Sequence, residues 1–133
     1  MANLLSVEEL IKQKAKYKMD DATIKKKLFI KRLDANIEIE VTKGDVADFL
    51  EITNKKDVTE KEAEAAGIHL VYSIVREPNL RDKELQTAFE CSEPTDIVEK
   101  IFSDGEMLDI VDFAIDLTGF RKGTVSMVED LKN

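Results

Sequence analysis

The sequence predicts a mostly helical α+β fold, in which an N-terminal β-hairpin packs on a bundle of about five short helices. Two patterns predict this fold. In the segment IEIEV, apolar and acidic residues alternate with a period of two, which is typical of a strand with one buried and one solvated face. Capping boxes, in which a Ser or Thr precedes a Glu by three residues, then mark helix starts at Ser6/Glu9, Thr59/Glu62 and Ser103/Glu106.

The chain has 133 residues, 43% of them hydrophobic, and no Pro-rich or Ser/Gly-rich tract. These properties predict a single domain over residues 1–133, made of a basic helical arm that can fray (1–26), the hairpin (27–41) and a helical region (42–133). No apolar run approaches the roughly 20 residues that span a bilayer. The N-terminus MANLLSVEEL lacks a basic leader, and the single Cys91 cannot form an internal disulfide. A cytoplasmic protein that does not contact membranes is therefore expected.

Charge is distributed unevenly along the chain. Residues 1–32 contain nine Lys or Arg and four acidic residues, a net charge of +5. Residues 33–133 contain eleven Lys or Arg and twenty-four acidic residues, a net charge of −13, and the two parts add up to the overall net charge of −8. Most of the surface would therefore repel a phosphate backbone, which makes nucleic acid an unlikely partner. The alternative function is a small regulatory or nucleic-acid-binding adaptor, which would use the basic arm. Two aromatic residues, Tyr17 in the arm and Phe29 just after it, lie among basic residues.

The N-terminal elements follow from the local patterns. A helix is predicted from Ser6 to about Met19, with lysines spread around it. The hairpin strands LFIKRL and IEIEV are joined by the turn-like segment DAN at 34–36. Because an isolated hairpin is only marginally stable, it must pack on helices or pair with the strand edge of another chain. The sequence is therefore compatible with a homo-oligomer.

Everything after Val41 is predicted to be helical. Helices are expected at 42–52 and from Thr59 to about Arg76, and Pro78 ends the second of them. Three more start at Asp82, at Ser92 or Glu93, and at Ser103; the last ends at Gly119, and a final segment, 124–131, docks or frays. The first of these helices is expected to bury Val46, Phe49 and Leu50. The apolar residues that the later helices carry are Ile68, Val71, Tyr72, Val75, Leu85, Ala88, Phe89, Ile97, Val98, Ile101, Leu108, Ile110, Val111, Ala114, Ile115 and Leu117.

The inventory of reactive residues predicts a protein that is not an enzyme and has no metal or cofactor. His69 is the only histidine and has no ligand at helical spacing. Cys91 has no cationic neighbours in sequence that would stabilise a thiolate. The acids Asp104 and Glu106 are explained by a helix start, where negative charge is stabilised by the helix dipole. The scattered glycines form no phosphate-binding loop.

The segment Glu77–Phe120 combines several helix stops and starts in a specific order. It begins with EPNLRD at 77–82 followed by Leu85, continues with Ala88 and Phe89, and then has Pro94, Gly105, Glu106, Gly119 and Phe120. In this order and content the segment resembles the XkdN-like phage tail assembly chaperones of PBSX-type prophages. The resemblance covers about a third of the chain.

The resemblance implies a chaperone that binds the tape measure protein in the cytoplasm of the infected cell and keeps it soluble. It also implies that the chaperone helps tail tube subunits assemble, with the tail tube protein as a further candidate partner, and that it is absent from the finished virion. An amphipathic client helix would lie in an apolar groove between short helices. The candidate groove residues are Leu80, Leu85, Phe89, Ile101, Phe102 and Phe120, each of which core packing would also explain.

Overall fold

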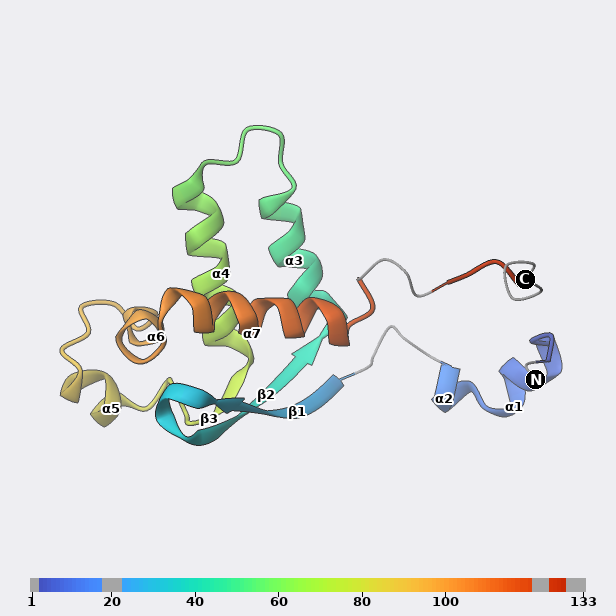
Figure 1. The fold of residues 1–133 in the computed structure, drawn as a ribbon, viewed down its shortest axis with the longest axis horizontal. Helices are drawn as coiled ribbons and strands as arrows, with labels where there is room; N and C mark the ends of the chain where they lie inside the picture. The colour runs from blue at the N-terminus through green and yellow to red at the C-terminus, as the bar shows by residue number, and fades with distance from the viewer. Residues whose placement is uncertain (1–2, 18–22, 121–124, 129–133) are drawn as a thin grey trace.

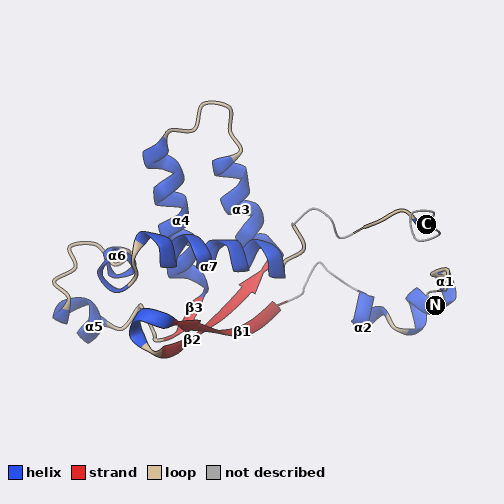
Figure 2. Cartoon of the chain, viewed as in Figure 1, coloured by secondary structure: helices blue, strands red, loops and turns tan. Residues whose placement is uncertain are grey.

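The computed structural model describes residues 3–17, 23–120 and 125–128 and confirms a mostly helical α+β fold with an N-terminal hairpin (Figures 1 and 2). A three-stranded antiparallel sheet packs against the helices. In chain order, the elements of the described residues are α1 (Val7–Lys12), α2 (Lys14–Tyr17), β1 (Thr23–Ile30), the 3-10 turn η1 (Lys31–Leu33), β2 (Ala35–Thr42), α3 (Lys43–Thr53), α4 (Glu60–Ile74), β3 (Val75–Glu77), α5 (Lys83–Ala88), α6 (Asp96–Ile101) and α7 (Asp104–Leu117).

The hairpin has the predicted alternation of buried and solvated residues. Ile37, Ile39 and Val41 of β2 are buried, whereas Glu38 and Glu40 between them are partly exposed. The first strand begins at Thr23 rather than at the predicted Lys27, because β1 and β2 stay paired from Ile30↔Ala35 as far as Thr23↔Thr42. The turn lies earlier than the predicted segment 34–36. The 3-10 turn η1 is followed by Asp34, which has a left-handed backbone with φ 49°, and Ala35 and Asn36 already belong to β2.

One short strand contradicts the expectation that everything after Val41 is helical. α4 ends at Ile74, and the next three residues form β3, which pairs antiparallel with β2. Val75 is buried, opposite Ile39 in this pairing. A strand of three residues is too short to show a period of two, so only the neighbouring β2 reveals it.

Helix α4 is the element around which the others pack, since it contacts α3, α6, α7 and β2. Buried apolar side chains from the hairpin and from these helices form one continuous cluster, and a helix that touches four other elements buries several faces. The largest fully buried side chains are Ile39, Val41, Val46, Val71, Ile74, Val75, Leu80, Ile97, Val98 and Ile110.

Most of the predicted helix starts are confirmed. Reciprocal capping boxes form at Thr59 and Ser103, and also at Thr42 with Asp45. The side chain of Asp82 caps α5. Gly119 has the expected positive φ of 83°, which a residue without a Cβ tolerates at a helix end.

The start of α6 was predicted wrongly. The helix begins at Asp96, and its N-cap, Thr95, makes no side-chain capping bond. Ser92 and Glu93 do not cap it. Instead, their backbone N–H groups donate to the carboxylate of Asp96, at 3.1 and 2.9 Å.

The N-terminal arm is less regular than predicted. Its expected helix from Ser6 to Met19 is interrupted at Gln13 and consists of α1 and α2. Residues 18–22, and half of the expected helix at 124–131, lie outside the described residues. Of that last segment, Val125 and Val128 are described, and both are exposed rather than docked on the core.

Arg32 connects the tip of the hairpin to the junction between α6 and α7. Its guanidinium donates two hydrogen bonds to the Glu106 carboxylate, at 3.0 and 3.1 Å, and a third to the carbonyl of Ile101 at 2.6 Å. The same carboxylate accepts from the backbone N–H of Ser103 as part of the capping box. The hydrogen bonds from Arg32, then those from Ser103, lower the pKa of Glu106.

We therefore expect the stabilisation by Glu106 to depend on pH. A carboxyl group whose pKa is lowered in the folded state stabilises the protein fully at pH values above its unfolded pKa of about 4.3. This stabilisation is lost as the pH falls through the folded pKa. Glu106→Gln should lower the melting temperature modestly at pH 7, and the difference from the unmodified chain should shrink progressively toward pH 3. Thermal unfolding followed by circular dichroism over this range tests it, and a difference independent of pH would contradict it.

Candidate functional site

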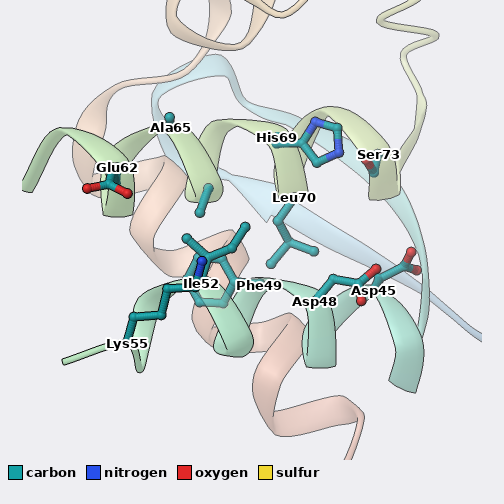
Figure 3. Close-up of a pocket in the computed structure, with 11 residues that line it drawn as sticks. Asp45, Asp48, Phe49, Ile52, Lys55, Glu62, Ala65, His69, Leu70 and Ser73 are labelled. Atoms are coloured by element: carbon teal, nitrogen blue, oxygen red, sulfur yellow. The ribbon is translucent and has the colours of Figure 1, made fainter. Parts of the chain in front are cut away.

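A surface cleft of about 560 Å³ separates α3 from α4 (Figure 3). Its apolar floor comes from both helices: Phe49 and Ile52 of α3 lie toward Leu70 of α4. Ala65 and Ala66 continue the α4 side, where their short side chains leave the space open. We call this feature the α3–α4 cleft.

The rim of the α3–α4 cleft is charged. Asp45 and Asp48 lie at one end, and Lys55 and Glu62 lie at the other (Figure 3). Asp45 and Glu62 are also the acidic members of the capping boxes of α3 and α4. The site therefore combines an apolar floor with a charged rim on which Asp45 and Glu62 are held in place by helix starts, an arrangement that suits an amphipathic segment.

A second hollow, of about 410 Å³, lies between α3, α4 and α7. We call it the α4–α7 hollow. Phe49 lines both this hollow and the cleft, and Leu108, which is 64% exposed, lines the α7 side. Glu60, Glu64 and Asp104 are the charged residues that line it, without any basic residue; the remaining lining residues are Thr53, Ala63, Gly67, Met107 and Val111. This hollow therefore carries only negative charge.

The structure does not gather the six groove residues expected from the sequence into one groove. Leu80 and Phe102 are buried in the core, and Leu85 and Ile101 are half-buried against it. Phe89 and Phe120 are exposed, by 41% and 37%. None of the six lines the α3–α4 cleft or the α4–α7 hollow.

The single histidine and the single cysteine have ordinary environments. His69 is exposed on α4 at the edge of the α3–α4 cleft, and Cys91 is half-buried beside the core. Among the described residues, no group of three or more His, Cys, Asp or Glu side chains is arranged to hold a metal ion. None of the described helices is long and apolar enough to cross a membrane.

Ile52, Ala65 and the other cleft residues are not among the six predicted groove residues, all of which are large apolar side chains in the C-terminal half of the chain. One signal was present in the first half of α4, the run AEAAG at 63–67. Small side chains on the face toward a neighbouring helix cannot fill the space between the two helices. An alanine-rich stripe beside Phe49 and Ile52 was therefore the available sign of a hollow.

An apolar cleft between two helices, with charged residues at its rim, has the features of a groove that can hold an amphipathic helix of another polypeptide. The chain belongs to the phage XkdN-like tail assembly chaperone family, whose model matches residues 7–132. This match extends well beyond Glu77–Phe120, the segment that carries the resemblance in sequence, and includes the basic arm from Val7.

A solved structure supports the fold. The chain resembles the crystal structure of the protein YqbN with a TM-score of 0.51 and 15% sequence identity, over 74% of this chain and 87% of that one. At this identity the likeness concerns the fold alone. No protein in the curated set used for comparison matches this chain.

Proposed function

We propose that this tail assembly chaperone binds a tape measure protein, keeps it soluble before assembly, and helps tail tube subunits assemble around it. The proposal rests on membership of the chaperone family. In this proposal the chaperone acts in the cytoplasm of the infected cell and is left out of the finished virion. No catalytic step is involved, since the role consists of binding and release.

The observation that favours a client-binding site is the α3–α4 cleft. In Figure 1 the α3–α4 hairpin extends past α7, on the side away from the sheet. An amphipathic client helix could place its apolar side on Phe49, Ile52 and Leu70 and its polar side between the charged residues at the rim. Of the six residues expected from the sequence, Phe89 and Phe120 are exposed enough to make additional contacts.

Filling the cleft should strongly weaken client binding without unfolding the chaperone. Ala65 is exposed and lines the cleft, so Ala65→Arg introduces a long side chain into the space that the client would occupy. Loss of contacts with a few apolar anchors typically weakens a complex by about 2 kcal/mol, or roughly 30-fold. Co-expression with an affinity-tagged tape measure protein, followed by quantification of the soluble complex, measures the effect.

Ala47→Arg is the matched control, because Ala47 is exposed on α3 and lies outside the cleft. It should bind like the unmodified chain. If Ala65→Arg retains binding while a Phe89→Ala, Phe120→Ala double variant loses it, the client lies on the surface around those phenylalanines. If the unmodified chaperone neither co-purifies with the tape measure protein nor increases its solubility, the proposed function is wrong.

A further inference from the structure

The N-terminal arm presents an apolar surface that no other described element covers. Leu4, Leu5, Val7, Leu10 and Ile11 are exposed by 39–99%. Val7, Leu10 and Ile11 share one face of α1, with a spacing of three and four residues. In the described stretch 3–17, which contains α1 and α2, the hydrogen bonds, the ion pair and the cation–π contact all join two residues of this same stretch.

Positive charge directly follows this apolar face. Lys12, Lys14 and Lys16 lie on the last turn of α1 and on α2. Lys12 forms an exposed ion pair with Glu8 at 3.2 Å. Exposed ion pairs of this kind contribute little to stability, so Lys12 can leave Glu8 for another acidic partner at little cost. The arm therefore has an apolar first half and a basic second half.

The α4–α7 hollow has the complementary chemistry. Its floor is formed by apolar and small side chains, with Leu108 exposed at its edge, and Glu60, Glu64 and Asp104 supply only negative charge. Those three acids make no side-chain hydrogen bond or ion pair among the described residues. They are thus available to a basic partner.

We infer that the α4–α7 hollow binds the N-terminal arm of a second copy of this chain. The apolar face of α1 covers Phe49, Met107 and Leu108, and the lysines approach Glu60, Glu64 and Asp104. Within one copy, α1 and α2 lie beyond the N-terminal end of β1, away from the α3–α4 hairpin (Figure 1). Reciprocal exchange of two arms closes a symmetric dimer.

The experiment measures the mass of the full chain in solution by light scattering coupled to size exclusion, over a series of protein concentrations. The unmodified chain should have about twice its monomer mass of 15.1 kDa. An arm variant, Val7→Asp with Ile11→Asp, and a hollow variant, Glu64→Lys with Leu108→Lys, should each raise the dimer dissociation constant by roughly tenfold or more. The four substituted side chains are exposed, so circular dichroism should show an unchanged fold.

Mixing provides the decisive control. In an equal mixture of the two variants, a mixed dimer has one contact with an intact arm in an intact hollow. In its other contact the introduced aspartates of the arm face the introduced lysines of the hollow, so the mixture should regain dimers. Asp109→Lys, on α7 but outside the hollow, should leave the mass unchanged. The inference is wrong if the unmodified chain is monomeric, if the arm variant still dimerises fully, or if the mixture does not recover. Because no client is present, these outcomes are independent of those for the proposed function.

Discussion

Leu80→Ala is expected to lower the free energy of unfolding by about 2–5 kcal/mol, the range for truncating a buried leucine. Leu80 is only 1% exposed and belongs to the main core cluster, between β3 and α5. Its truncation leaves a cavity that the packed helices can fill only in part. Because whole domains are stable by only about 5–15 kcal/mol, the variant should unfold at a clearly lower urea concentration.

Phe89→Ala is the matched comparison, since Phe89 comes from the same sequence segment but is 41% exposed. Its free energy of unfolding should change by only about 0.5 kcal/mol, the usual effect of a surface substitution. Urea unfolding of both variants separates a core role from a surface role. Equal destabilisation of the two would show that the burial assigned to Leu80 or Phe89 is incorrect.

Ile39→Lys should leave little folded protein. Ile39 is fully buried at the centre of the sheet, between Lys26 of β1 and Val75 of β3 in the strand pairing. An unpaired buried ammonium costs an amount comparable to the stability of a whole domain, and a neighbouring lysine adds like-charge repulsion. We expect loss of the cooperative thermal transition in circular dichroism.

Phe29→Lys controls for the added charge and for the lost apolar side chain. Phe29 lies on the neighbouring strand β1 but is 58% exposed, so its replacement should keep the cooperative transition and shift it only slightly. If Ile39→Lys unfolds with the same midpoint as Phe29→Lys, β2 is not the buried centre of the sheet.

Elements whose signals are local could be predicted from the sequence. The alternation of Ile37, Ile39 and Val41 with glutamates identifies β2, and the Ser or Thr with an acid three residues later identifies the starts of α4 and α7. In these cases the residues that carry the signal also make the contacts, as the capping bonds show.

Features that depend on distant residues could not be predicted. β3 exists because β2 offers an edge with which it can pair, and α6 begins where the Asp96 side chain binds the preceding turn. Leu108 matches the apolar pattern of α7 yet is exposed, because it lies at a hollow that no other described element fills. The six candidate groove residues likewise share their apolar character but differ widely in burial.

The sequence by itself determined the mostly helical α+β class, the hairpin and the chaperone family, because alternation, helix caps and the order of helix stops are properties of neighbouring residues. Only the tertiary structure decided which apolar side chains remain on the surface and where they form hollows. A hollow such as the α3–α4 cleft results from how closely two helices approach. That distance is set by side chains far apart in the sequence, such as Phe49 and Ala66.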